Sequence, residues 1–132
     1  MGGAGGPTLL RVPGGLSAPG RAREAVLSHL DLPTDDRCAG DVALLVSELV
    51  TNAVRHAGVG PEGEILIRVL VLEGRLRLCV QDPGSSSIPR LAEPDPERPG
   101  GMGLFIVKQL SSSWGVAKTG AGTTNVWCEI PF

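Results

Sequence analysis

The feature that most constrains this chain is an amphipathic segment between Asp41 and Ala57. When residues are placed about 100° apart, as in an α-helix, polar residues gather on one side and apolar residues on the other. The polar side holds Asp41, Glu48, Asn52 and Arg55, and the apolar stripe holds Val42, Val46, Leu49, Val50 and Ala53. Such a stripe is typical of a helix that packs against a core. The segment therefore predicts a long helix with one buried face and one polar face.

The polar face of this helix offers three groups that suit a magnesium-nucleotide site. Glu48 is a candidate general base, the Asn52 carboxamide can supply oxygen to a hard cation, and Arg55 can meet phosphate. Glu48 and Asn52 are four residues apart and so share a helix face. On this segment alone, a surface helix with solvated charges explains the pattern equally well.

The composition predicts a chain that folds without metals or disulfides. It has 132 residues, of which 42% are hydrophobic, so one core can form. Cys38, Cys79 and Cys128 are far apart and form no CxxC pair, which predicts reduced, mostly buried thiols in the cytosol. No stretch has the features of a signal peptide, and no apolar run approaches the roughly 20 residues of a membrane helix. We therefore expect one cytoplasmic domain that does not enter a membrane.

The charge distribution argues against direct binding of nucleic acid. The net charge is −2, and the basic residues are scattered along the chain. The chain also has no tyrosine. A nucleic-acid binder usually presents a basic stripe or aromatic side chains on which bases stack.

Hydrophobic periodicity and turn residues predict an alternation of strands and helices. The glycine-rich residues 1–6 are expected to be flexible. Trp114 and Trp127 are expected in the core, because large aromatic groups bury much apolar area. Glu73-Gly74 predicts a hairpin turn. The expected elements are an edge strand over 8–12, a helix over 18–30, the long helix from 34 or 35 to 57, strands over 64–72 and 75–81, a helix over 103–110, and strands over 116–118 and 124–132.

A long segment without apolar periodicity separates the hairpin from the next helix. Residues 83–100 contain five prolines and three serines. Loops of this length in a small domain are usually functional or disordered. The segment leads through Gly100, Gly101 and Met102 into a helix. A glycine-rich approach to a helix start suits phosphate, because backbone N–H groups point toward the anion there.

Four blocks now follow one another in order: Glu48 to Ala57, Asp82-Pro83-Gly84, Gly101 to Leu104, and Gly122-Thr123-Thr124. Together they resemble the N, G1, G2 and GT boxes of the GHKL ATPase family, which includes gyrase, Hsp90, MutL, histidine kinases and anti-sigma serine kinases. The resemblance covers residues 7–132 as one histidine-kinase-like ATPase domain. It implies the Bergerat fold, an α/β two-layer sandwich whose mixed, mainly antiparallel sheet is covered on one face by helices.

The resemblance implies ATP and Mg²⁺ as cofactors and assigns roles to single residues. Asn52 would coordinate Mg²⁺, Glu48 would activate a nucleophile, and Arg55 would reach phosphate. Asp82 would accept a hydrogen bond from the adenine amino group. Gly84 would let the base approach closely.

The later blocks would complete the nucleotide site. The third block would lie at the phosphates, with its two glycines presenting backbone N–H groups, and its residues are Gly101, Met102, Gly103 and Leu104. Thr124 would support the adenine through its hydroxyl group or a water. Residues 83–100 would form the ATP lid. One position departs from the family, because the usual second glycine of the G1 box is Ser86 here, which bears on the lid hinge and on nucleotide affinity.

Within the family, the chain is most similar to the stand-alone anti-sigma factor serine/threonine kinases. Its length leaves no room for a transducer domain, and no phosphoacceptor hairpin precedes the long helix. His29 is interpreted as an ordinary helix-end histidine, whereas Glu48 suits a serine nucleophile, which benefits from a base. The resemblance implies a sigma factor and an anti-anti-sigma protein of the STAS type as partners, and it allows a homodimer.

Two alternatives from other classes stay open. The first is a binding module that sequesters a regulator in an ATP- or ADP-dependent manner without phosphotransfer. The second is a catalytic subunit that phosphorylates a histidine on a separate chain.

Overall fold

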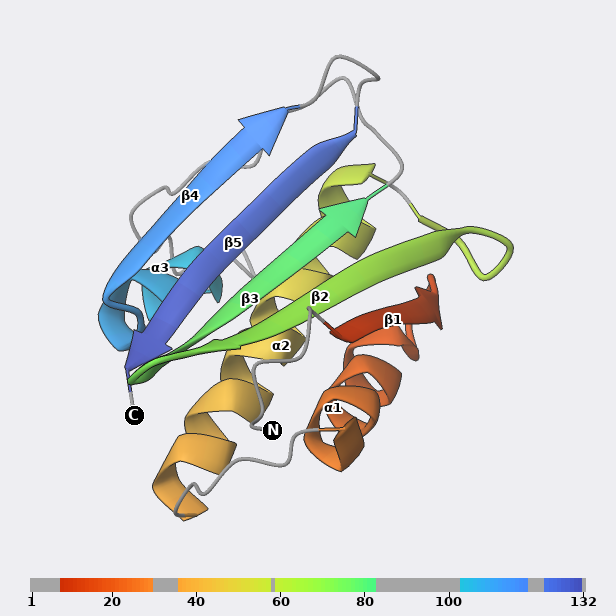
Figure 1. Cartoon of the computed structure of the whole chain (residues 1–132). Helices are drawn as coiled ribbons and strands as arrows, with labels where there is room; N and C mark the ends of the chain where they lie inside the picture. Colours follow the sequence, from red (N-terminus) through yellow and green to blue (C-terminus); the bar gives the residue numbers. More distant parts are fainter. Residues whose placement is uncertain (1–7, 30–35, 58, 83–102, 119–122, 132) are drawn as a thin grey trace.

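The structure is a computed structural model, and it describes residues 8–29, 36–57, 59–82, 103–118 and 123–131 (Figure 1). The predicted flexible N-terminus and the predicted lid lie outside these ranges. The elements in chain order are β1 (Thr8–Pro13), α1 (Ala18–His29), α2 (Asp36–Ala57), β2 (Glu64–Leu72), β3 (Arg75–Asp82), α3 (Gly103–Leu110), β4 (Ser113–Lys118) and β5 (Thr124–Pro131).

The strands form a five-stranded sheet in the order β1-β2-β3-β5-β4. All four pairings among the described strands are antiparallel. A mixed, mainly antiparallel sheet was expected, and the described strands contain no parallel pair. The helices α1, α2 and α3 lie behind the sheet in Figure 1 and leave its front face without a described helix. This arrangement confirms the predicted α/β sandwich with helices on one face.

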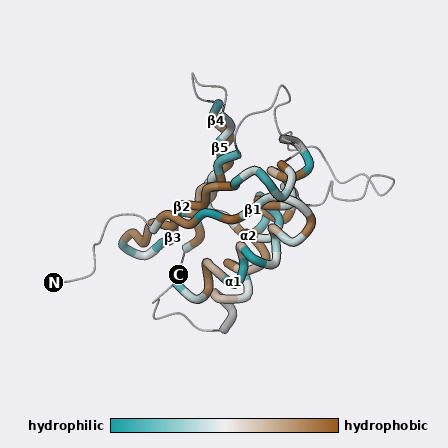
Figure 2. The backbone as a smooth tube through the Cα atoms, turned by 90° about the vertical axis from the view of Figure 1, so that its right-hand side faces the viewer, coloured by the Kyte–Doolittle hydropathy of each residue, from teal (hydrophilic) through white to brown (hydrophobic). Residues whose placement is uncertain are grey.

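The core lies between the sheet and the helices. Alternate residues of β3 and β5 are buried and face it, while their neighbours face the other side. Figure 2 shows the hydrophobic colouring that β2 and β3 contribute to this layer. The apolar stripe of α2 is buried as predicted, and its members Val42, Val46, Leu49, Val50 and Ala53 are each at most 4% exposed.

Local sequence explains where several elements begin and end. The turn between β2 and β3 contains Gly74, whose φ of +74° favours glycine. At the end of α1, Nδ1 of His29 lies 2.8 Å from the carbonyl oxygen of Ala25. The side chain thus contacts a carbonyl group in the last turn of the helix, in keeping with the helix-end histidine that was expected.

Two expectations need correction. β4 begins at Ser113, three residues before the predicted start, because Trp114 already pairs with Cys128 on β5 and packs against the core. Trp127 does not enter the core; it is half-buried on the side of the sheet opposite the helices, since it alternates with the buried Val126 and Cys128.

Cys38 and Cys128 are buried and Cys79 is half-buried. No described helix is both long enough and apolar enough to cross a membrane.

Candidate functional site

Two polar residues meet at one end of the sheet. Asp82 ends β3 and lies directly opposite Thr124, which begins β5. Their exposures are 3% and 1%, and they are the only buried polar or charged side chains among the described residues. Polar and charged side chains are seldom fully buried, so two of them together on adjacent strands stand out from the apolar core. This end of the sheet is therefore the strongest candidate for a binding site.

Two buried polar atoms have no hydrogen-bond partner among the described residues. The Oγ1 atom of Thr124 and the Nδ2 atom of Asn52 are fully buried, and neither has a hydrogen-bond partner among the described residues. Native proteins satisfy the large majority of such atoms, and an unsatisfied one destabilises the fold by about 1–3 kcal/mol. Both atoms therefore fit a site whose ligand supplies the missing partner.

Asn52 lies in the C-terminal part of helix α2. The C-terminal part of α2 lies behind the end of β3 where Asp82 is found (Figure 1), and the two elements are in contact. Glu48 precedes Asn52 by one turn and is half-buried, while Arg55 is exposed and follows it by nearly one turn. The structure thus keeps the predicted polar face of α2 beside the apolar stripe that packs into the core.

Several predicted site residues lie outside the described part of the chain. These are Gly84, Gly101 and Met102, together with the predicted lid over 83–100. The backbones of Gly103 and Leu104 form the first turn of α3, as the predicted phosphate-binding helix start requires.

The described residues offer side-chain groups that could bind the cation or the phosphates of Mg-ATP. Asn52 brings a carboxamide whose oxygen and nitrogen exchange places by a half-turn of the side chain. It can therefore offer oxygen to a cation or an N–H group to phosphate. No group of three or more histidine, cysteine, aspartate or glutamate side chains in the described ranges could hold a metal. Mg²⁺ suits such a site, since it usually combines few protein ligands with phosphate oxygens and water.

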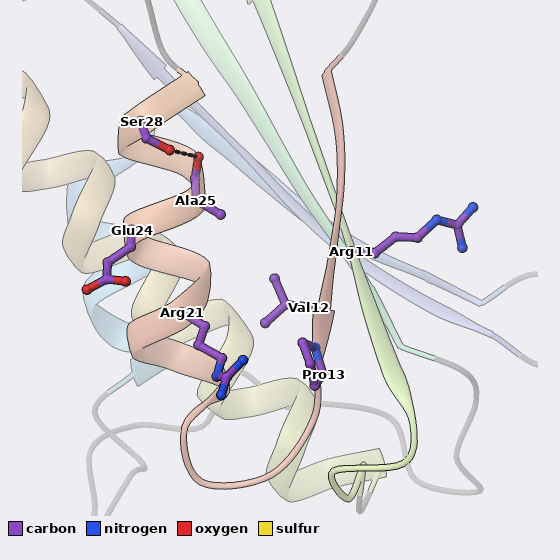
Figure 3. Close-up of a pocket in the computed structure, with 7 residues that line it drawn as sticks. All are labelled: Arg11, Val12, Pro13, Arg21, Glu24, Ala25 and Ser28. Carbon is purple, nitrogen blue, oxygen red and sulfur yellow. Dashed lines mark hydrogen bonds between the residues drawn. The ribbon is translucent and has the colours of Figure 1, made fainter.

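Three cavities in the described part were compared with the candidate site. Two of them include none of Asp82, Asn52 and Thr124, and one includes Asp82 alone. One of about 530 Å³ lies between β1 and α1, where Val12 points toward α1 and Arg11 points away from it (Figure 3). A second, of about 310 Å³, includes Asp82 but is otherwise lined from β1, β2, the turn before β2, and Gln81. The third, of about 400 Å³, is on the helix-free face of the sheet. None of the three contains both Asn52 and Thr124.

The third cavity is the feature that sequence reasoning missed. Trp127 helps to line it, although a core position was expected. The strict alternation along β5 was the signal that could have found it, because Trp127 lies between two residues that face the core.

The fold is an α/β sandwich, and comparison with known proteins identifies its family. Residues 16–128 match the family described as the histidine kinase-like ATPase domain. The chain belongs to this GHKL family.

The chain is similar in sequence to two kinds of protein kinase. The chain is 34% identical over 90 residues to the serine-protein kinase RsbW of Bacillus pumilus, and 38% identical over 82 residues to that of Listeria monocytogenes. Each alignment covers 53% of this chain and 52% of the relative, so the chain spans about half the length of these curated relatives. It is also 37% identical over 109 residues to the blue-light-activated histidine kinase 2 of Erythrobacter litoralis, an alignment that covers 78% of this chain and 30% of that protein.

Proposed function

We propose that the chain binds Mg-ATP and transfers its γ-phosphoryl group to a serine or threonine of a protein partner. The observation that carries the proposal is the pair of unsatisfied buried atoms, Nδ2 of Asn52 and Oγ1 of Thr124, together with the buried Asp82 opposite Thr124. The presence of Glu48 one helical turn before Asn52 adds a candidate base to this nucleotide site.

Each end of the nucleotide has its own set of residues in this proposal. Asp82 accepts a hydrogen bond from the adenine amino group, and Thr124 supports the same ring through its hydroxyl group. Because both side chains are shielded from water, these hydrogen bonds are stronger than they would be at the surface. Their burial therefore supports base recognition.

The triphosphate would extend toward α2 and α3. Asn52 holds the cation, Arg55 approaches phosphate, and the block from Gly101 to Leu104 offers backbone N–H groups. Bound Mg²⁺ would neutralise charge that develops on the phosphates during transfer. Residues 83–100 act as the lid, and Gly84 lets the base lie close to the backbone.

Glu48 is the reason for proposing transfer to a hydroxyl group and not nucleotide binding alone. A serine or threonine hydroxyl is a weak nucleophile that a positioned carboxylate can activate by accepting its proton. Glu48 is half-buried on the same helix face as Asn52, which supports such a position.

The partners follow from the relatives that are serine-protein kinases. We propose that residues 7–132 act as an anti-sigma factor kinase, which binds a sigma factor and phosphorylates an anti-anti-sigma protein of the STAS type. Similarity to RsbW over about half of each chain supports this role. A homodimer is the assembly that we propose for it.

A second candidate is transfer to a histidine on a separate chain. The longer alignment with a histidine kinase favours it. A third is a nucleotide-dependent binding module without transfer, which Ser86 favours because it replaces the usual second glycine of the G1 box.

The deciding experiment uses ATP labelled on its γ-phosphate together with an extract of the source cells. Acid-stable label on a small second protein supports the serine/threonine kinase, whereas acid-labile label supports the histidine alternative. Absence of transfer despite ATP binding supports the binding module. Glu48→Ala should abolish the transfer while nucleotide binding persists, and transfer that survives this change would exclude Glu48 as the base.

A further inference from the structure

The helix-free face of the sheet carries a cleft of about 400 Å³. Strands β2, β3, β4 and β5 all contribute to it, and its residues on β3 and β5 alternate with those that face the core. Its volume falls within the range of about 300–1,000 Å³ that is common for small-molecule sites. The residues that matter for its chemistry are Arg68, Leu70, Arg77, Cys79, Asn125 and Trp127.

One wall of the cleft is formed by the guanidinium group of Arg77 stacked on the indole ring of Trp127. Trp127 lies opposite Gly115 on β4, and a Cβ atom at Gly115 would lie 2.7 Å from the Cζ2 and Nε1 atoms of the indole. The ring therefore occupies space that only glycine leaves open. The guanidinium carbon of Arg77 is 4.5 Å from the centre of the Trp127 ring. This cation-π contact holds the guanidinium beside the cleft.

The second guanidinium belongs to Arg68 on β2. Its side chain is exposed, and it forms no ion pair within the described part of the chain. Arg77 is only weakly neutralised, since its Nε atom is 4.0 Å from Glu129, whose closer partner is Arg75 at 3.4 Å. The cleft therefore carries an excess of positive charge in a protein whose net charge is −2.

The Cys79 thiol lines the cleft and responds to the positive charges of Arg68 and Arg77. Burial raises the pKa of the Cys79 thiol, and the positive charges of Arg68 and Arg77 oppose that rise. The Sγ atom of Cys79 donates to Oδ1 of Asn125 at 3.8 Å. The amide N–H₂ group of Asn125 is left as a further donor for an anion.

We propose that this cleft binds a small aromatic carboxylate. The carboxylate would pair with the guanidinium groups of Arg68 and Arg77, which form charge-assisted hydrogen bonds with planar anions. The flat ring would lie against the apolar surface of Leu70 and Trp127. Two arginines exclude a cationic ligand, and the apolar surface favours an organic acid over inorganic phosphate. The site is on the opposite side of the sheet from the helices, so the proposal does not depend on the nucleotide-binding function.

The test uses benzoate as the probe and benzamide as its uncharged control of the same shape. The indole N–H resonance of Trp127, assigned with Trp127→Phe, reports binding by NMR. Benzoate should shift this resonance in a saturable manner, and benzamide at equal concentration should not. Equal shifts from both compounds would overturn the proposal, because charge would then play no part.

Matched arginine variants complete the test. Arg68→Gln and Arg77→Gln should each weaken benzoate binding about tenfold, the effect of losing one charge-assisted hydrogen bond. Arg75→Gln is the control, since Arg75 lies on the same face but pairs with Glu129 outside the cleft. It should change the affinity less than about twofold. Unchanged binding by Arg68→Gln and Arg77→Gln would overturn the proposal.

A second measurement does not depend on how the variants fold. Benzoate should slow the reaction of Cys79 with iodoacetamide in the unaltered protein, because the thiol lines the cleft. Unprotected Cys79 at saturating benzoate would contradict binding in this cleft. The proposal would equally fail if benzoate caused no shift of the Trp127 resonance in the folded protein.

Discussion

Asp82 and Thr124 face each other across the β3-β5 ladder, and they are the two polar side chains that the described part of the protein buries. Their pairing joins residues 42 positions apart at one end of the sheet, and the C-terminal part of α2 lies behind this end (Figure 1). We propose that the Asn52 carboxamide joins this carboxyl group and this hydroxyl group in one nucleotide site.

Thr124→Val should separate stability from nucleotide binding. Valine has nearly the shape of threonine but lacks the Oγ1 atom, which has no partner in the described structure. Without nucleotide, we expect the free energy of unfolding in urea to stay equal or to rise by about 1 kcal/mol, because an unsatisfied buried group is removed. ATP affinity measured by calorimetric titration should fall about tenfold. A large loss of stability without nucleotide would show that the hydroxyl group has a structural partner instead.

Asn52→Ala should reduce the dependence of ATP binding on Mg²⁺. The proposal makes Asn52 a ligand of the cation, so the gain in affinity that Mg²⁺ gives should fall about tenfold. Titrations with ATP in the presence of Mg²⁺ or of EDTA measure this gain. Ser47→Ala is a suitable control on the same helix, since the Ser47 hydroxyl bonds to Arg23 and to the Ala43 carbonyl oxygen. An equal effect from both variants would indicate a general disturbance of α2.

Two adjacent leucines test the packing of α2. Leu45 is 0% exposed, and Leu44 is 40% exposed. Leu45→Ala should lower the free energy of unfolding by about 2–5 kcal/mol, because it leaves a cavity between helix and sheet. Leu44→Ala should change it by less than about 1 kcal/mol. Urea unfolding of both variants measures the difference, and similar losses would mean that α2 packs in another orientation.

Stability should fall at alkaline pH through Cys128. Burial, together with the nearby Cys79 and Glu129, raises the pKa of the Cys128 thiol from 9.0 to about 12. The folded state therefore keeps a proton that the unfolded state loses between these two values. The stabilisation is complete below pH 9.0 and is lost as the pH rises toward about 12.

The measurement is the free energy of unfolding as a function of pH. Its slope above pH 9.0 should reach about −1.4 kcal/mol per pH unit from this group alone. Cys128→Ala should show a smaller slope than the unaltered protein. The same slope in both proteins would mean that Cys128 does not control this pH range.

The sequence was sufficient to predict those parts of the structure that depend on local patterns. The stripe from Val42 to Ala53 predicted which face of α2 is buried, and Gly74 predicted the hairpin. Asp82 and Thr124 were identified separately, each from its own short block.

The remaining features depend on how distant segments pair. The opposition of Asp82 and Thr124 requires the strand order β3-β5, which no single segment encodes. The alternation along β5 decides which face Trp127 occupies, whereas the room for its indole comes from Gly115 on the neighbouring strand, which has no side chain. Hydrophobicity alone predicted a core position for this tryptophan, because it ignores which side of the sheet a strand residue faces.

The most direct test of the account is calorimetric titration of the unaltered protein and of Asp82→Asn with Mg-ATP. The account predicts binding by the unaltered protein and a loss of about tenfold to a hundredfold in Asp82→Asn, because the carboxylate is the acceptor for the adenine amino group. Circular dichroism should show both proteins folded. Equal affinity of the two proteins, or no binding by the folded unaltered protein, would contradict a nucleotide site at Asp82, Asn52 and Thr124.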